Sequence, residues 1–168
     1  MRVLNDISAQ TDPAMLALAL RAPGCALVMM HGYDHHTGAC GCAAHANAPD
    51  VVFASLFGRA AAAASAGLPE HSIWLDPGFG FGKSPEENVA ILRNLAGLCT
   101  GPYPVVVGPS RKRFLHVLTA AHRQGGSNGS FDADSATAEA CGIARQQGAS
   151  VLRVHRPESA RAEVPNQH

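Results

Sequence analysis

Short apolar runs alternate with segments of helical periodicity along the whole chain. Five apolar runs predict strands, at residues 2–4, 25–30, 73–76, 104–107 and 151–155. Helices are expected at 13–20, 50–66, 85–95, around Phe114 to Leu118, and at 135–147. Strands that are apolar throughout and alternate with helices are typical of a parallel sheet buried on both faces. The sequence therefore predicts an α/β fold.

The segments between these elements are polar or rich in glycine. Residues 33–49 contain many His, Gly, Cys and Ala residues without periodicity, and residues 124–134 are interpreted as a mobile loop. The chain becomes polar after Arg156. We therefore expect one domain over residues 1–156 and a fraying tail over residues 157–168.

A polar group follows every predicted strand at its carboxyl end. These groups are Asn5 and Asp6, His31, Asp76, Ser110-Arg111-Lys112, and Arg153 with His155. A (β/α) barrel gathers its active-site residues at that end, because all the loops there meet at one mouth. An open doubly wound sheet also binds ligands at that end, though usually with fewer strands.

The stretch from Ile73 to Lys83 carries the strongest chemical signal. A buried strand brings the Asp76 carboxylate to its end, where Pro77 and the glycines at 78, 80 and 82 break the extended pattern. Phe79 and Phe81 alternate with these glycines and offer flat apolar surface. This combination suits a planar, hydrogen-bonding heterocycle, whereas the fingerprints of mononucleotide and dinucleotide loops are absent from the sequence. The alternative is a structural turn in which Asp76 caps a helix.

Composition and charge exclude several classes of protein. The 168 residues are 46% hydrophobic and 15% charged, as in a folded globular domain. Thirteen basic residues balance thirteen acidic residues, so the net charge favours neither nucleic acid nor an anionic membrane as a partner. No apolar run approaches the length of a transmembrane helix, and the first residues do not resemble a signal peptide. We expect a cytoplasmic protein whose five cysteines are reduced thiols.

Several motifs, in this order, resemble the dihydropteroate synthase family, the pterin-binding enzymes of folate synthesis. They are Leu4 to Ala9, Met30-His31, Leu75 to Lys83 with Asn88, Val107 to Lys112, and Arg153-Val154-His155. The resemblance extends to about residue 156, and related pterin-binding methyltransferases share the barrel without the full set of motifs.

The resemblance implies a fold, a reaction and a cofactor. The family fold is a TIM-type (β/α) barrel, of which this chain supplies about the last five βα units. The family is a transferase that condenses 6-hydroxymethyl-7,8-dihydropterin diphosphate with para-aminobenzoate, giving 7,8-dihydropteroate and diphosphate. The resemblance also leads us to expect Mg²⁺ as a cofactor and a homodimer as the assembly. No metal ligand is expected in this chain, because the family's Mg²⁺ ligand lies in the first three strands of the barrel. Two mobile loops and an aspartate of the family site also belong to those strands.

The resemblance also assigns site residues. The pterin is expected to contact Asn5, Met30, Asp76, Phe81, Gly108 and Lys112. Para-aminobenzoate is expected at Ser110 and Arg111, diphosphate at Arg153 and His155, and the catalytic residues are Lys112, Arg153 and His155. Other interpretations are a surface ion pair for Arg153 and His155, a frayed terminus at Asn5, and plain core packing for Met30 and Phe81.

The loop after His31 departs from the family pattern. It contains His35, His36, Cys40, Cys42 and His45, which are residue types that bind Zn²⁺. A C-x-C pair is tighter than the usual C-x-x-C knuckle, so we expect a solvated loop without zinc. The absent first strands leave a second hypothesis for the whole chain, an inactive pterin-binding remnant or a partner subunit.

Overall fold

The computed structural model describes residues 2–8, 12–32, 48–122 and 131–158. Five strands are present in these ranges: β1 (Arg2–Asp6), β2 (Cys25–Met30), β3 (Ile73–Asp76), β4 (Val106–Val107) and β5 (Val151–Leu152). All observed strand pairs are parallel. A single parallel bridge between Leu75 and Val105 joins the three-stranded and two-stranded sheets, so the strands lie side by side in chain order. The predicted α/β order is confirmed.

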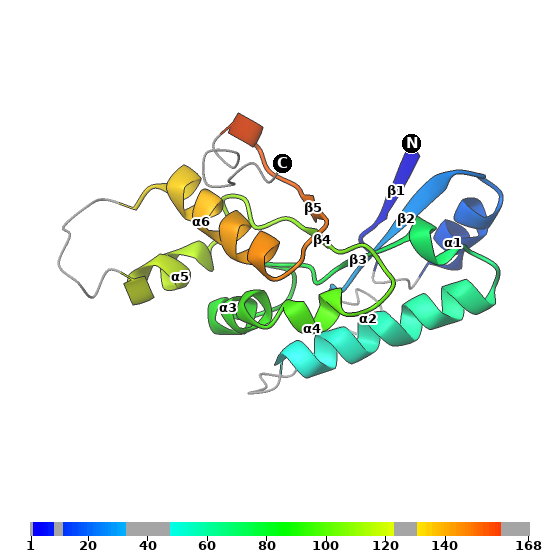
Figure 1. Ribbon diagram of the computed structural model, residues 1–168, viewed down its shortest axis with the longest axis horizontal. Helices are drawn as coiled ribbons and strands as arrows, with labels where there is room; N and C mark the ends of the chain where they lie inside the picture. The colour runs from blue at the N-terminus through cyan, green and yellow to red at the C-terminus, as the bar shows by residue number, and fades with distance from the viewer. Residues whose placement is uncertain (1, 9–11, 33–47, 123–130, 159–168) are drawn as a thin grey trace.

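Helices connect the strands and cover the sheet. They are α1 (Pro13–Leu20), α2 (Ala48–Ser65), the 3-10 turn η1 (Glu70–Ser72), α3 (Pro85–Arg93), α4 (Ala96–Cys99), α5 (Leu115–His122) and α6 (Ala133–Gln146). Figure 1 shows α2, α3 and α4 along one side of the strands, with α5 and α6 packed together beyond β4 and β5.

Sequence signals account for where two of these helices begin. Asp12 caps α1 by accepting a hydrogen bond from the Ala14 amide, and Pro13 occupies the first helical position. Ser84 and Glu87 form the predicted capping box at the start of α3.

The core lies between the sheet and the long helix α2. Every residue of β2 is buried, because the strand has neighbours on both sides and helices against it. Val52, Leu56, Ala60 and Ala63 recur at helical spacing along α2 and are almost wholly buried.

Several element boundaries differ from the prediction, among them those of α6, α3 and β5. Helix α6 begins at Ala133 instead of Ser135, because the Asp132 carboxylate accepts bonds from the amides of Asp134 and Ser135. The helix expected to run from 85 to 95 ends at Arg93 and is followed by the separate α4. Strand β5 ends at Leu152 instead of His155. Its partner β4 runs into Gly108-Pro109, and Pro109 has no amide hydrogen to continue the ladder.

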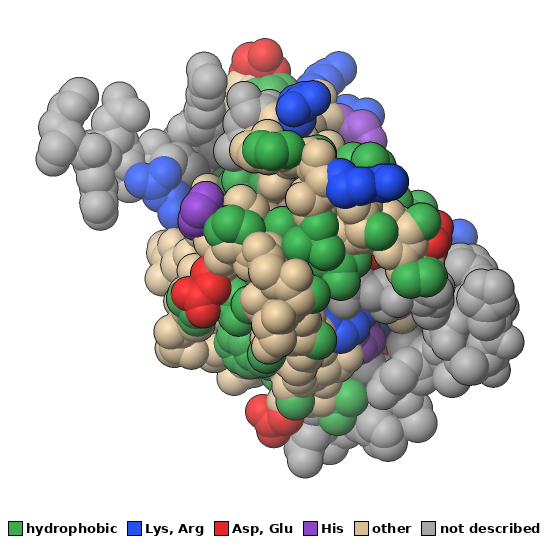
Figure 2. All heavy atoms as spheres, turned by 90° about the vertical axis from the view of Figure 1, so that its right-hand side faces the viewer, with side chains coloured by type: hydrophobic (Ala, Val, Ile, Leu, Met, Phe, Trp, Pro, Cys, Tyr) green, Lys and Arg blue, Asp and Glu red, His purple; other side chains and the backbone are tan. Residues whose placement is uncertain are grey.

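One face of the molecule exposes large apolar side chains. Figure 2 looks onto the right-hand side of Figure 1, where β1 and α1 lie, and shows hydrophobic side chains at the surface. The large hydrophobic residues that are exposed are Val3, Ile7, Leu18 and Leu20. Within the described residues, β1 has a strand partner on one side only. This end of the sheet therefore has an open edge with apolar surface beside it.

Some predictions concern residues outside the described ranges. These are the zinc question at His35, His36, Cys40, Cys42 and His45, most of the predicted loop at 124–134, and nearly all of the tail after residue 156. Residues 48 and 49, predicted as loop, belong to α2. Cys25, Cys99 and Cys141 are free thiols. No helix in the described ranges is long and apolar enough to cross a bilayer.

Candidate active site

Asp76 is the last residue of β3, and its side chain is 1% exposed. Its Oδ1 atom accepts a hydrogen bond of 2.7 Å from the Gly78 amide. Its Oδ2 atom accepts one of 3.0 Å from an Nη atom of Arg153, a residue 77 positions away in the chain. Asp76 does not cap a helix, because Ser84 caps α3, but the bond from the Gly78 amide does give it the structural role in the turn that the alternative included.

Burial has the largest effect on the pKa of the Asp76 carboxyl group. Desolvation raises the pKa of Asp76, because the charged form loses contact with water. The Gly78 amide and the positive charges of Arg153, Lys112 and Lys83 lower the pKa in turn, but the effect of burial is larger. A buried carboxylate with raised pKa in a pocket of basic groups is typical of a ligand-binding site.

The glycines after Asp76 are required by close approaches of other groups. Gly78 has a φ of +67°, and a Cβ atom there would lie 1.9 Å from the carbonyl oxygen of His31. Gly80 has a φ of +78°, and a Cβ atom there would lie 2.9 Å from Cδ of Lys112. At Gly78 a side chain would clash with backbone and displace the loop, whereas at Gly80 it would strain the left-handed backbone and displace the Lys112 side chain.

Lys83 and Asn88 hold this loop in place. The Lys83 ammonium donates to the carbonyl oxygens of His31, Gly78 and Phe81 at 3.0, 3.0 and 3.1 Å. The buried Asn88 side chain accepts a bond of 2.8 Å from the Gly80 amide. Sequence reasoning included both residues in a motif but gave neither a role. The position of Lys83, just after the glycine-rich turn, is a signal that could have revealed its role. Such a turn leaves backbone carbonyls unpaired, and a nearby lysine can donate hydrogen bonds to them.

Lys112 reaches the same loop from the segment after β4. Its ammonium donates to the carbonyl oxygen of Phe79 and lies 4.4 Å from the centroid of the Phe81 ring. Burial lowers the pKa of Lys112, whereas the nearby Asp76 carboxylate raises it and Arg153 lowers it. Phe81 is half-buried, so its ring face is available beside a cation.

Arg153 joins the first strand to the centre of the site. Besides its ion pair with Asp76, its guanidinium donates to the Asn5 side-chain oxygen at 3.4 Å. Asn5 lies within β1, so the alternative of a frayed terminus is wrong. The structure thereby brings together Asn5 from β1, Asp76 from the end of the central strand β3, and Arg153 from directly after β5.

Ser110 and His155 form a second cluster. The Ser110 Oγ and His155 Nδ1 atoms are 2.8 Å apart, and the His155 amide donates to the same oxygen at 3.3 Å. Ser110 is buried, and both residues line a cavity of about 670 Å³. The cavity lining consists of Gly80, Lys83, Pro85, Asn88, Ser110, Arg111, Lys112, Arg113, Phe114 and His155.

The remaining predicted site residues have different surroundings. Met30, at the end of β2, has no exposed surface and packs in the core. Gly108 leaves room for Arg153, because a Cβ atom there would lie 3.1 Å from an Nη atom of that residue. Arg111 lines the cavity, but its guanidinium is paired with Asp134.

Comparison with known proteins places the chain in a family. Residues 1–155 match the family described as pterin binding enzyme. The chain belongs to that family. A dihydropteroate synthase of Streptococcus pyogenes serotype M6 is 36% identical over 156 residues, which cover 91% of this chain and 53% of the relative. The family assignment predicted from the motifs is confirmed.

Solved structures agree with this assignment. The dihydropteroate synthase of Thermus thermophilus in complex with 6HMPPP has a TM-score of 0.78 and 35% identity, covering 95% of this chain and 61% of that one. The same enzyme in complex with 4-aminobenzoate has a TM-score of 0.76 and 35% identity, covering 95% and 59%. The fold is thus part of a TIM-type barrel, as predicted. The chain spans about half the length of the curated relatives it matches.

The pterin-binding family resemblance led us to expect Mg²⁺, and the described residues do not fit it. They contain no group of three or more His, Cys, Asp or Glu side chains that could hold a metal ion. Both carboxylate oxygens of Asp76 already accept bonds from Gly78 and Arg153. Mg²⁺ therefore stays a prediction.

His31 makes the stability of this pterin-binding fold sensitive to pH. Burial, followed by the charges of Lys83 and Arg59, lowers the pKa of His31 from 6.5 to about 3. The unfolded chain therefore binds a proton between pH 6.5 and 3 that the folded chain does not. The free energy of unfolding should fall as the pH drops through this window, by about 2 kcal/mol between about pH 7 and about pH 5.

Urea unfolding at the two pH values measures this loss. A His31→Gln variant should show a smaller difference between them, because glutamine does not titrate. An equal difference in both proteins would show that other groups cause it.

Proposed function

We propose that this chain carries the pterin and diphosphate subsites of a dihydropteroate synthase. One observation carries the proposal: a buried carboxylate, Asp76, is held among Asn5, Lys112 and Arg153 at the carboxyl ends of parallel strands. Family membership over residues 1–155 supports it. So do the related enzymes solved in complex with 6HMPPP and with 4-aminobenzoate.

Asp76 and Asn5 would bind the amino-pyrimidine edge of the pterin. Two N–H donors on that edge match the two oxygens of a carboxylate, which makes a short, charge-assisted pair of bonds. In the structure Arg153 occupies the Asp76 Oδ2 atom. Pterin binding would release this guanidinium, and the half-exposed Arg153 could then turn toward the diphosphate. Lys112, from the segment after β4, and the Phe81 ring, from the loop that follows Asp76, would contact the pterin ring.

Arg153 and His155 would then stabilise the leaving group. The bond between the pterin methylene carbon and the ester oxygen of the diphosphate breaks, and the oxygen keeps the electron pair. The amine of para-aminobenzoate donates its lone pair to that carbon and loses a proton. Negative charge grows on the diphosphate as the bond breaks, so an arginine fork favours the transition state over the ground state. Ser110 lines the cavity where the aminobenzoate would lie.

The second candidate is a pterin-binding protein without turnover. The observation that favours it is that the described residues form five neighbouring parallel strands with an open edge at β1, in a chain that spans about half the length of its curated relatives. Both candidates require the pterin subsite, and they differ only in catalysis.

Calorimetry with 6-hydroxymethyl-7,8-dihydropterin tests the requirement that both candidates share. We expect one site per chain with an affinity in the micromolar range, about −8 kcal/mol, as for a small heterocycle in a formed polar pocket. Guanosine, a purine with an amino-pyrimidine edge but a bulky ribose, serves as the control ligand and should bind more weakly. An absence of heat with the pterin at millimolar concentration would reject the proposed function.

A further inference from the structure

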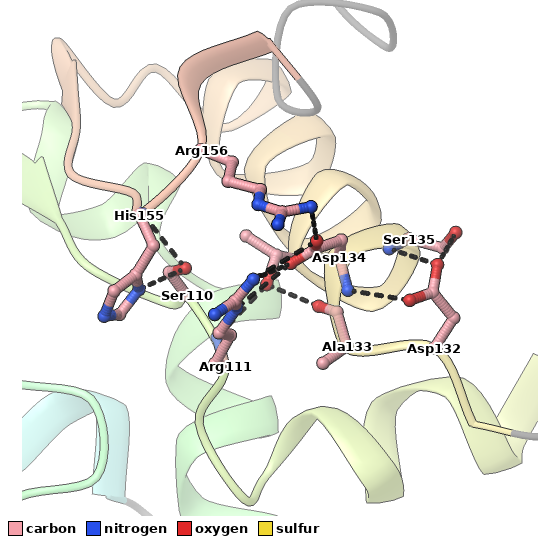
Figure 3. A network of polar contacts seen from close by, with 9 residues as sticks. Ser110, Arg111, Asp132, Ala133, Asp134, Ser135, His155 and Arg156 are labelled. Atoms are coloured by element: carbon pink, nitrogen blue, oxygen red, sulfur yellow. Dashed lines mark hydrogen bonds and ion pairs between the residues drawn. The ribbon is translucent and has the colours of Figure 1, made fainter.

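Asp134 connects two separate segments that carry site residues. It lies in the first turn of α6 and is a quarter exposed. Its Oδ1 atom accepts bonds from Nε and Nη2 of Arg111 at 3.1 and 3.0 Å, and its Oδ2 atom accepts one from Arg156 at 3.2 Å. Figure 3 shows both guanidinium groups converging on this one carboxylate. Arg111 follows β4 and Arg156 follows β5, so the carboxylate bridges the ends of two neighbouring strands.

The backbone of Arg111 is held by the same helix. Arg111 is the only non-glycine residue with positive φ among the described residues, at +55°. Its amide donates to Thr137 Oγ1 at 3.1 Å, and this buried hydroxyl donates to the Ala133 carbonyl at 2.7 Å. A left-handed residue that carries a side chain costs about 1–2 kcal/mol. Such a conformation persists where its surroundings hold it, and it is found at functional sites more often than elsewhere.

The residues next to these arginines are the ones that line the cavity. Ser110 and Lys112 flank Arg111, and His155 precedes Arg156. Ser110 and His155 bond to each other across the two segments, with the Asp134 group beside them in Figure 3. Beyond the pairing of β4 with β5, which ends with the bond from the Arg153 amide to the Val107 carbonyl, one direct contact and one ion-pair cluster join the two segments.

We propose that Asp134 is a positioning residue for the anion subsite, and that Arg111 and Arg156 act through it by placing Ser110 and His155. The proposal rests on the proposed function. It also gives Arg111 a different role from the predicted contact with aminobenzoate. The Arg111 guanidinium is held by Asp134, and its left-handed backbone shapes the loop between Ser110 and Lys112. The bidentate geometry and the two arginines make this cluster stronger than a single exposed ion pair.

Removing the Asp134 carboxylate affects anion affinity in two opposite ways, and a binding measurement shows which effect is larger. Removing a negative charge and freeing two arginines would raise the affinity for an anion if Asp134 only competed with the ligand. Losing the placement of Ser110 and His155 would lower it. We expect the second effect to prevail, with affinity for inorganic diphosphate about tenfold lower in Asp134→Ala. Affinity for 6-hydroxymethyl-7,8-dihydropterin should change less than about twofold, because Asp76 and Asn5 do not touch the cluster.

The matched control is Asp132→Asn. Asp132 lies two residues earlier and caps α6, and asparagine caps a helix about as well as aspartate. This variant loses the same charge at the same helix end without touching the arginines, so its diphosphate affinity should not fall. Asp134→Glu should recover most of the affinity lost in Asp134→Ala. Unchanged or higher diphosphate affinity in Asp134→Ala would overturn the proposal.

A second measurement needs no ligand. The nitrogen NMR shift of His155 Nδ1 reports its hydrogen bond with Ser110. It should move in Asp134→Ala and return in Asp134→Glu, while Asp132→Asn leaves it in place. The same shift in the wild type and in all three variants would also overturn the proposal. Because this measurement uses no ligand, it tests the role of Asp134 even if the wild-type chain binds no diphosphate and the proposed function fails.

Discussion

Replacing Asp76 by alanine is expected to abolish detectable pterin binding. The carboxylate is buried, so its removal would leave the N–H donors of a bound pterin without partners in a place water does not reach. Each such unpaired donor costs about 1–3 kcal/mol, so two together weaken binding by about a hundredfold or more. The affinity measured by calorimetry for 6-hydroxymethyl-7,8-dihydropterin checks this expectation.

Two further variants separate loss of contact from loss of fold or charge. Asp76→Asn retains an oxygen for the Gly78 amide and should fold normally, but it loses one acceptor and the charge. It should bind pterin much more weakly than the wild type. Asp50→Ala removes an exposed carboxylate from the first turn of α2 and should bind pterin normally. Unchanged affinity in both Asp76 variants would mean that the pterin does not lie on this carboxylate.

The ends of strands can be recognised in the sequence of an α/β chain, and the structure brings together three of the polar residues found there. Apolar runs without alternation mark strands buried on both faces, and the first polar residue after each run must lie at the common mouth. Asn5, Asp76 and Arg153 follow this rule, and the structure brings them within hydrogen-bonding distance. The sequence could not predict that Arg153 bonds to both Asn5 and Asp76, because these contacts depend on the curvature of the partial barrel.

Contacts between distant elements were the part that escaped prediction. Asp134 was assigned to a mobile loop, since its neighbours are polar and glycine-rich, yet it starts a capped helix and holds two arginines. The family resemblance assigns Arg111 to para-aminobenzoate, whereas in the structure its guanidinium is paired with Asp134. Its positive φ and its pairing partner arise from tertiary structure, which local propensity does not encode.

Catalysis is the property for which the extent of the chain matters most. The described residues form five neighbouring parallel strands, whereas a TIM-type barrel closes with eight. Strand β1 has one partner among them, and Val3, Ile7, Leu18 and Leu20 are exposed next to its open edge. An unpaired parallel strand with apolar surface beside it favours association with another polypeptide. We expect residues 1–168 on their own to be weakly stable or to self-associate.

Binding and turnover should therefore separate in the isolated chain. The proposed contacts of Asp76, Lys112, Arg153 and His155 are all available on strands β3, β4 and β5 or directly after them. The family resemblance assigns the Mg²⁺ ligand and the loops around aminobenzoate to strands outside these five. Residues 1–168 should bind pterin but show little condensation of dihydropterin diphosphate with para-aminobenzoate. Preceding them with three βα units from the Streptococcus pyogenes relative should raise turnover by about a hundredfold or more, because positioning of the second substrate dominates such reactions.

The deciding assay is diphosphate release with both substrates and Mg²⁺, on monodisperse preparations of the two proteins. Asp76→Ala in the longer protein is the control for background hydrolysis and should release little diphosphate. Pterin affinity should be similar in the two proteins whose Asp76 is intact, since both contain Asn5, Asp76 and Lys112. Equal turnover by residues 1–168 and by the longer protein would show that five strands suffice for catalysis. The second substrate would then have to be held by the residues that line the cavity between Gly80 and Ser110.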